Sequence, residues 1–300
     1  MLDYRAHTFL EVYRQRSFTR AADALLITQP AVSQHVRQLE AYYGCALFSK
    51  TRRGIEPTPA ARMLYDRLLT MENDERRMRD EAARLAGARD SGRPIPLTFA
   101  CTRTIADYVA PRIVAAHLGR DPDCPVTMRA GNTRDLVRAL DRGEIDFALV
   151  EGSFDRERFA SEVLSREPYI AVAGPGPAAA ARPASIRDLL DRRLILREAG
   201  SGTREILEKH LAARDLAIDD FASAVELESI PTIKACVSQG AGITFLYRAA
   251  VQRELERREL LDITPRDFAI EHDFCLIWQR GSQFAARYRA LCEAWRELLS

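Results

Sequence analysis

The sequence has few residues of the kinds that bind structural metals or form disulfides. Its 300 residues include six cysteines and five histidines, and we find neither a C-x-x-C pair nor a nearby set of cysteines and histidines. This scatter argues against a disulfide framework and against structural zinc, so we expect no metal and no other cofactor. The histidines form no nucleophile–base–acid pattern, so we expect no enzyme activity.

Long hydrophobic runs are also missing. No run of about eighteen apolar residues occurs, and the N-terminus lacks the basic start and apolar segment of a signal peptide. We therefore expect a cytoplasmic location and no contact with a membrane. The 47% of hydrophobic residues is still enough for real cores, and a mass of 33.8 kDa suits two domains, or one small and one large domain.

Net charge is nearly absent from the whole chain but is unevenly divided along it. The formal net charge is +1, while residues 1–62 hold nine Lys/Arg against five Asp/Glu. The first 62 residues thus carry four excess positive charges, and the remainder carries three excess negative charges. A basic start on a mildly acidic remainder fits a DNA-binding head on a body with another task.

The stretch 17–40 (SFTRAADALLITQPAVSQHVRQLE) predicts two short helices that meet across a tight turn. We expect Thr19 to cap a helix over 20–26 and Thr28 to cap a second helix. The second helix begins at Gln29–Pro30, where proline is tolerated because the first turn has no intrahelical use for its N–H. Its apolar residues recur at spacings of four, three and four and form one stripe: Val32, Val36, Leu39 and Tyr43.

The other face of this second helix is polar. It offers amide, hydroxyl and guanidinium groups, which are the groups that read base edges and contact phosphates in a major groove. An ordinary amphipathic hairpin with a solvated side is the alternative, because polar outer faces are the rule for surface helices. The residues that we expect to contact DNA here are Thr28, Gln29, Pro30, Ser33, Gln34 and Arg37.

A longer pattern favours the DNA-binding interpretation. From Ala21 to Glu40 the sequence follows A-A-x-x-L-x-x-T-Q-P-A-V-S-x-x-V-R-x-L-E, and it resembles the helix-turn-helix of LysR-type transcriptional regulators. The resemblance continues through Gly44, Leu47–Phe48, Thr51, Arg53–Gly54 and Thr58. It implies a winged helix-turn-helix DNA-binding domain over residues 1–58.

The segment after Gly44 predicts a two-stranded wing with its tight turn at Gly54. Arg52 and Arg53 at the tip are suited to phosphates or to the minor groove, where guanidinium is favoured. The arginine that the family has directly after Leu-Phe-x is Lys50 here, which keeps the charge but loses the bidentate fork.

From Pro59 to about Ala86 the sequence predicts one long helix, and we assign 59–90 to this linker helix and a hinge. Its apolar positions are spaced alternately four and three residues apart and so form an apolar seam along the helix. Either its own domain or a second subunit has to cover this seam. In the LysR family this helix is the dimer contact, so the resemblance implies a homodimer or homotetramer. The seam runs Leu64, Leu68, Met71, Glu75, Met78, Ala82 and Leu85, and Glu75 and Ala82 weaken it.

After the Gly/Pro-rich linker 87–96, segments typical of strands alternate with segments typical of helices. This alternation predicts a parallel sheet flanked by helices. The expected strands are 97–101, 126–130, 146–150, 169–173, 193–196, 224–227, 242–246 and 274–278. The expected helices are 105–118, 133–142, 202–213, 229–239, 247–257 and 283–299.

Four pieces of this part also resemble the LysR family, whose effector domain is similar to a periplasmic binding protein of two α/β lobes. They are AGNT from Ala130, GEIDFALVEG from Gly143, LREAGSGTR from Leu196 and VSQGAGI from Val237. The resemblance implies an effector-binding domain over 91–300, with lobe 1 at about 91–165 and 270–300 and lobe 2 at about 166–269. Such a fold forms its ligand site at the carboxyl ends of strands, in a cleft between the lobes.

Three hydroxyl-rich turns stand ahead of helices in this domain. Free backbone N–H groups and the helix dipole attract anions there, although capping alone explains each turn taken singly. Brought together in one cleft, the three turns predict a site for a small carboxylate or inorganic oxyanion, with Arg103 as its counter-charge. The expected effector-binding residues are Thr102, Arg103, Thr104, Asn132, Thr133, Ser201, Gly202 and Thr203.

Two further details bear on the effector. The run Gly200–Arg204 resembles a branch of the family that includes regulators of sulfur and one-carbon assimilation, which favours small oxyanions or compact metabolites. Cys101 lies next to Thr102, and we expect it to be an inert small hydrophobe rather than an oxidant sensor.

These patterns predict a LysR-type transcription regulator whose activity a small, anionic effector modulates. Two heads would read a partly palindromic site on double-stranded DNA. The alternative is a cytoplasmic enzyme or solute-binding protein with a binding-protein fold and an unrelated helical head, which predicts turnover or uptake and no binding to DNA.

Overall fold

The computed structural model describes residues 2–51, 54–86, 95–151, 153–176 and 182–299. The chain divides into two compact units, of which the first comprises residues 1–92 and 279–285 and the second comprises residues 93–278 and 286–300. Within the described ranges, none of the helices combines the length and the hydrophobicity that a bilayer-spanning helix needs.

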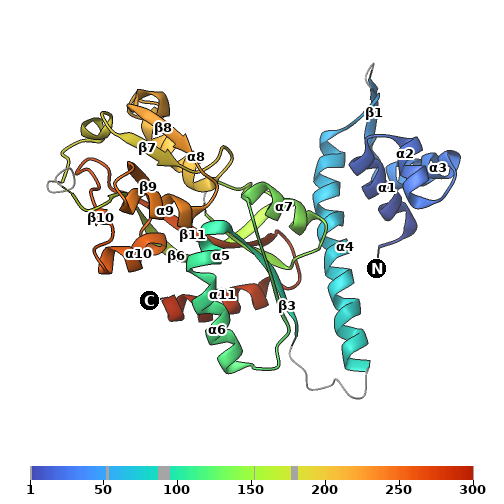
Figure 1. The fold of residues 1–300 in the computed structure, drawn as a ribbon. Coiled ribbons are helices and arrows are strands. Elements are labelled where there is room, and N and C mark those ends of the chain that lie inside the picture. The colour runs from blue at the N-terminus through green and yellow to red at the C-terminus, as the bar shows by residue number, and fades with distance from the viewer. Residues whose placement is uncertain (1, 52–53, 87–94, 152, 177–181, 300) are drawn as a thin grey trace. The chain divides into compact units, whose positions relative to one another are not determined.

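The first unit begins with three short helices, continues with a hairpin and leads into one long helix (Figure 1). The hairpin is antiparallel, with Thr51 opposite Gly54, so the predicted wing is confirmed. The long helix has the predicted bounds. The elements are α1 (Tyr4–Gln15), α2 (Phe18–Leu25), α3 (Gln29–Tyr43), β1 (Phe48–Thr51), β2 (Gly54–Pro57) and α4 (Pro59–Ala86).

Side-chain caps set where α2 and α3 begin. The Ser17 hydroxyl accepts a hydrogen bond from Arg20 N (3.3 Å), so α2 starts at Phe18 and Thr19 lies inside the helix. The prediction of a Thr19 cap was therefore wrong, because Ser17 reaches a free N–H of the first turn two residues earlier. Thr28 caps α3 as predicted, since its hydroxyl accepts from Ala31 N (3.4 Å).

A cluster of small and β-branched side chains fixes α3 against α1 and α2. Val32 and Val36 are buried on α3, and Ala21 and Ala22 on α2 let the two helices approach closely because their side chains are short. The predicted apolar stripe of α3 ends earlier than expected, because Tyr43 is 40% exposed. Burial of this one stripe turns the polar face of α3 outward.

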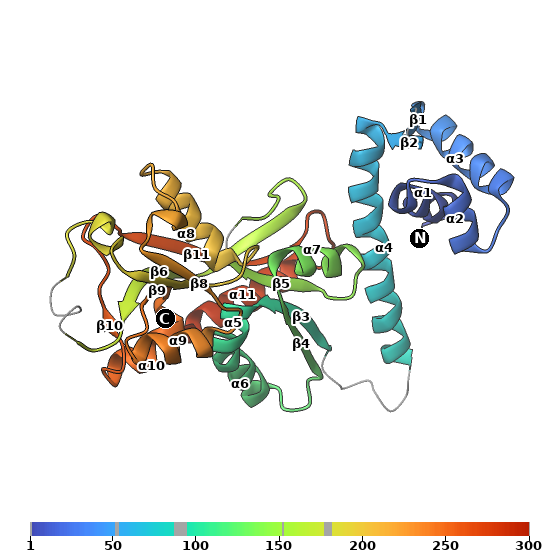
Figure 2. The same ribbon diagram turned by 45° about the horizontal axis from the view of Figure 1, so that its top comes forward.

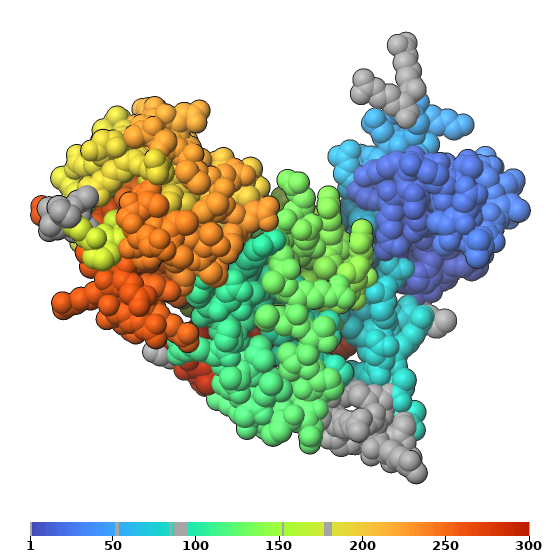
Figure 3. Space-filling view, viewed as in Figure 1, coloured from blue at the N-terminus to red at the C-terminus, as the bar shows by residue number. Residues whose placement is uncertain are grey.

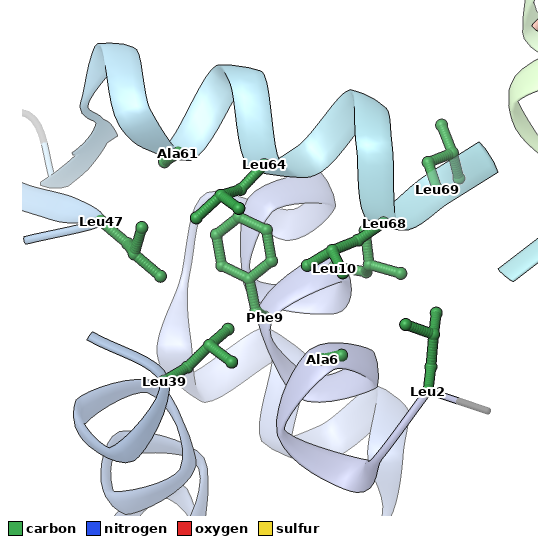
Figure 4. Close-up of a cluster of buried hydrophobic side chains, with 10 residues drawn as sticks. All are labelled: Leu2, Ala6, Phe9, Leu10, Leu39, Leu47, Ala61, Leu64, Leu68 and Leu69. Carbon is green, nitrogen blue, oxygen red and sulfur yellow. The ribbon is translucent and has the colours of Figure 1, made fainter. Parts of the chain in front are cut away.

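A second cluster holds α4 on the same domain. Phe9 of α1 is fully buried, and its ring points toward Leu64 of α4 in the close-up (Figure 4). Leu64 and Leu68 are thus covered within their own chain, which corrects their assignment to a seam between subunits. Met71 and Met78, farther along α4, are 53% and 48% exposed.

The second unit is built on one mixed sheet with the strand order β4-β3-β5-β11-β6-β9-β7-β8, and β10 pairs with β6. β3 is parallel to β4 and β5, and β7 is parallel to β8 and β9. The expectation of a parallel sheet holds only in part, because β11 is antiparallel to β5 and β6 is antiparallel to β9. The strands are β3 (Leu97–Thr102), β4 (Val126–Gly131), β5 (Phe147–Glu151), β6 (Phe159–Ala173), β7 (Arg193–Leu196), β8 (Ser223–Glu226), β9 (Ile243–Tyr247), β10 (Leu261–Asp262) and β11 (Ile270–Gln279).

Helices alternate with these strands within a few residues of the predicted positions. The helix expected over 105–118 is divided at Val109, where Pro111 has no N–H to continue the ladder. α9 and α10 lie beside β6 and β9 (Figure 2). The helices are α5 (Arg103–Tyr108), α6 (Ala110–Arg120), α7 (Thr133–Asp141), α8 (Gly202–Ala212), α9 (Ile230–Ser238), α10 (Arg248–Glu256) and α11 (Ala285–Leu299).

The packing of α4 on the head predicts unequal effects of two neighbouring substitutions. Leu64→Ala leaves a cavity next to Phe9 and should cost the head about 2–5 kcal/mol of unfolding free energy. Met63→Ala removes a side chain that is 56% exposed and should change the unfolding free energy by less than about 0.5 kcal/mol. Hydrogen–deuterium exchange of α1 measures both effects, and equal protection of α1 in the two variants would contradict this packing.

Candidate DNA-binding and effector sites

The polar face of α3 is accessible along its first three turns. Gln29, Pro30, Gln34 and Arg37 are exposed and Ser33 is half-buried, whereas the stripe on the opposite side of the helix is buried. The Gln29 amide donates to the Ser33 hydroxyl (2.9 Å), which orders the amide along the helix. Thr28 is exposed where α3 begins.

A concave surface joins this face to the wing. It has a volume of about 470 Å³, and Lys50 of β1 lies on it together with Ser33 and Arg37 of α3. Amide, hydroxyl and cationic groups thus share one hollow on the head, which is the combination that contacts bases and phosphates together. Arg52 and Arg53, the two predicted wing contacts, lie outside the described residues.

The second unit brings polar strand ends together where lobe 1 meets lobe 2. Thr102 is the last residue of β3 and Glu151 the last residue of the neighbouring parallel strand β5. Gly202 opens α8 so close by that a Cβ on it would stand 3.4 Å from Glu151 Cγ. In the space-filling view, the green atoms of lobe 1 lie against the orange atoms of lobe 2 (Figure 3).

Three hydroxyl groups surround the buried carboxyl group of Glu151. Thr102 Oγ1 donates to Glu151 Oε2 (2.6 Å) and Thr104 Oγ1 donates to Oε1 (3.0 Å). Thr203 Oγ1 lies 3.5 Å from Oε1 and 3.3 Å from Thr104 Oγ1. Glu151 is 3% exposed, and this burial raises its pKa, although the hydrogen bonds from the threonines and the charge of Arg197 act in the other direction.

An ion pair between a buried arginine and a half-buried glutamate lies beside this cluster. Arg197, which is 4% exposed, donates through Nε and Nη2 to the two oxygens of Glu198 (2.7 and 2.8 Å). Burial raises the pKa of Glu198, but the hydrogen bonds and charge of Arg197 outweigh it and lower the pKa below its usual value. Nη1 of Arg197 has no hydrogen-bond acceptor in the described part of the chain.

The predicted effector residues gather around two adjoining cavities. The smaller cavity, of about 10 Å³, has room for roughly one water molecule, and the larger has a volume of about 580 Å³. Thr104 and Thr203 are buried behind Glu151. The smaller cavity is lined by Thr102, Arg103, Asn132, Thr133, Ser201 and Gly202 from the prediction, and by Gly131, Glu151, Arg197 and Glu198.

The hydroxyl groups differ in whether they are free to donate a hydrogen bond to a ligand. Those of Thr102 and Thr104 already donate to Glu151, so they are not the free anion donors that the sequence suggested. The side chain of Asn132 caps α7 by accepting from Asp135 N (2.9 Å). Ser201 is 5% exposed, does not cap α8 through its side chain and faces the smaller cavity.

Sequence reasoning missed Glu151, Arg197 and Glu198. The available signal was an acid at the end of the buried strand FALVE, since a carboxylate is almost never fully buried without a partner or a function. Arg197 and Glu198 directly follow a strand in the same way.

The expectation that no cysteine lies near a histidine was wrong. His117 Nε2 lies 3.3 Å from Cys124 Sγ with the carboxylate of Asp121 close by, so a nearby Cys/His set does exist. Burial raises the pKa of Cys124, which keeps it a thiol that can donate to this histidine or to the Ile95 carbonyl (3.5 Å). Cys101 is fully buried, and burial followed by the charge of Glu151 raises its pKa, as expected of an inert thiol.

Comparison with known proteins covers nearly the whole chain. Residues 5–62 match the bacterial regulatory helix-turn-helix protein family of lysR type, and residues 91–300 match the LysR substrate binding domain. The regulator CfxR of Cupriavidus necator is 34% identical over 262 residues, which are 85% of this chain and 79% of that protein. The RuBisCO operon transcriptional regulator of Allochromatium vinosum is 28% identical over 278 residues, 92% of this chain and 89% of that protein.

Solved structures share the fold. An OxyR C206 mutant of Corynebacterium glutamicum has a TM-score of 0.62 at 22% identity and covers 98% of this chain and 90% of that chain. The regulatory domain of CcmR from Synechocystis, in complex with 2-PG, has a TM-score of 0.60 at 22% identity and covers 68% of this chain and 96% of that chain.

These matches agree with the winged head, the long helix and the α/β body with its polar cleft. The chain belongs to the LysR family and is a DNA-binding transcription regulator with an effector-binding domain.

Proposed function

We propose that the chain acts as a dimer, or a dimer of dimers, that places α3 of each head in the major groove of a partly palindromic site on double-stranded DNA. The observation that carries this proposal is the division of α3 into a buried stripe and an exposed face of Gln29, Gln34 and Arg37. The positive excess of residues 1–62 supports contact with phosphates. Because its partner is DNA, we place the protein in the cytoplasm.

The dimer proposal rests on the exposed part of α4. Met71 and Met78 are seven residues apart and therefore lie on one side of the helix, where two thioether side chains are open to solvent. A second copy of α4 would cover this stripe. Glu75, which lies between the two methionines, is engaged by Leu2 N (3.0 Å) and Arg79. The contact between subunits thus uses the middle of α4 rather than Leu64 and Leu68.

The effector, in our proposal, is a small anion in the cleft between the lobes. Arg103, Arg134 and Arg197 line the two adjoining cavities, and the first turns of α7 and α8 open onto them. The CcmR regulatory domain, which shares this fold, has been solved in complex with 2-PG. Binding in such a cleft favours one arrangement of the lobes over others and so changes how the protein acts on DNA.

Two substitutions on the head should affect DNA binding in different ways. Gln29→Ala removes a group that reads base edges, so it should weaken binding to the cognate site by about 1–3 kcal/mol and leave random DNA unaffected. Lys50→Ala removes a phosphate contact, so it should weaken binding to both duplexes and reduce the salt slope by about 0.9. Fluorescence polarisation at several salt concentrations measures both, and loss of random-DNA binding in the Gln29 variant would contradict base reading.

The subunit contact is tested by placing charge on α4. A Met71→Glu/Met78→Glu variant puts carboxylates on the proposed stripe and should shift the protein toward monomers by sedimentation velocity. Met63→Glu, an exposed methionine off that stripe, is the matched control and should leave the distribution unchanged. An unaltered dimer in the double variant would refute the assignment.

A further inference from the structure

The cleft contains an acid where an anion is expected to bind. Two arginines, Arg103 and Arg197, and two glutamates, Glu151 and Glu198, line the smaller cavity. With all four ionised their formal charges cancel, so net charge does not favour an oxyanion that sits in the larger cavity and places one oxygen in this smaller one, and that oxygen meets the Glu151 carboxylate. One proton on Glu151 leaves the cavity with an excess positive charge.

Glu151 is the group of these four that can take up this proton. A guanidinium group does not lose its proton in proteins, and Glu198 is held ionised by its two hydrogen bonds from Arg197. Glu151 is buried, and its hydrogen-bond partners in the described part of the chain are neutral hydroxyls rather than arginines. Neutralising it removes the cost of a buried charge.

We propose that the effector of this site is an oxyanion that binds together with one proton, which Glu151 holds as a neutral carboxylic acid. This inference rests on the proposed effector role of the cleft. It makes Glu151 the residue that selects the charge of the ligand.

The hydrogen-bond geometry supplies the mechanism. While Glu151 is ionised, the single hydrogen of the Thr102 hydroxyl points at Oε2, 2.6 Å away. Once Oε2 carries a proton from solvent, the acid donates to Thr102 Oγ1 instead, because a protonated carboxyl is a donor. The hydrogen of Thr102 is then free to turn into the smaller cavity, which this residue lines. Protonation of Glu151 thus turns Thr102 into a donor for the oxyanion.

The other partners of the site are consistent with this change. Thr104 can keep its hydrogen bond to Oε1, and Ser201 and Arg197 line the same cavity as further donors. Burial, followed by the charge of the nearby Glu151, raises the pKa of Cys101, Tyr169 and Tyr247, so all three stay neutral in this pH range. They therefore exchange no proton when an anion binds.

Two histidines near a neighbouring cavity are a second source of protons in the described part of the chain. His272 lines that cavity, and its ring lies 5.7 Å from that of His210. Burial lowers the pKa of both histidines, with smaller contributions from neighbouring charges. Proton uptake by these histidines would be the same in the wild type and in a Glu151 variant, so such a variant separates the two sources.

The proposal is tested by calorimetric titration of the full-length protein with sulfate, which does not itself titrate between about pH 6 and pH 8. Titrations in two buffers of different ionisation enthalpy give the number of protons taken up. We expect uptake of up to one proton per site, and an affinity that falls by up to about tenfold per pH unit above the pKa of Glu151 in the free protein.

Matched variants assign the proton to Glu151. Glu151→Gln keeps a neutral group that donates to Thr102, so it should bind sulfate with no linked proton and no pH dependence. Glu167→Gln is the control, because burial also raises the pKa of the half-buried Glu167 but this residue lines neither cavity, and the variant should behave as wild type. Thr102→Val should lose sulfate binding at least tenfold, while Thr244→Val, at another buried threonine, should not.

Several results would overturn the proposal. They are an absence of sulfate and inorganic phosphate binding at about pH 6, an absence of proton uptake in the wild type, or unchanged uptake in the Glu151→Gln variant. Loss of binding in a folded Glu151→Gln variant would also overturn it, because it would show that the carboxylate itself is needed. If DNA binding persists in any of these cases, the regulator function stands and only the proton-linked site fails.

Thermal unfolding gives an independent readout of the same acid. A carboxyl group whose pKa is raised by folding binds protons more tightly in the folded state, so stability is lost as the pH rises from about 4.5 through the folded pKa. The melting temperature of the wild type should therefore fall across this window relative to that of Glu151→Gln. Parallel curves for the two proteins would show that Glu151 is not a perturbed acid.

Discussion

The burial of one carboxyl group, that of Glu151, is the constraint on which the effector domain depends. An uncompensated charge at this depth is costly, and the structure offsets it with three hydroxyls from two distant segments of the chain. Thr102 and Thr104 come from the end of β3 and the start of α5, and Thr203 comes from α8 in the other lobe. The requirement to satisfy this group therefore links the two lobes at the place where a ligand would bind.

The head follows a simpler rule, in which apolar burial on one side of a helix determines what the other side can do. Val32 and Val36 pack against the alanines of α2, and this contact leaves the amide and guanidinium groups of α3 in solvent. Phe9 and Leu64 connect the same head to α4. The polar face is thus presented by a packed scaffold, as reading of base edges requires.

The sequence predicted the elements well and the relations between distant side chains less well. Helix and strand positions follow from local periodicity and caps, so the wing, α3 and α4 were found within a few residues. Periodicity showed that the stripe of α4 is covered but left open whether its own domain or a second subunit covers it, and only the fold shows that the head covers Leu64 and Leu68. The partners of Glu151 lie 47 to 52 residues away in the chain, and no local pattern joins them. Turn composition located Thr102 and Ser201, but only the fold shows that Thr102 is already engaged.

The central claim is that one chain combines a DNA-reading face with a cleft that senses a small oxyanion. The most direct test is the affinity of the full-length protein for the intergenic DNA upstream of its own gene, measured by fluorescence polarisation with and without sulfate. The account predicts tighter binding to this DNA than to a shuffled duplex, and a change in that affinity when sulfate fills the cleft. Equal affinities for the two duplexes, with no response to the anion, would contradict it.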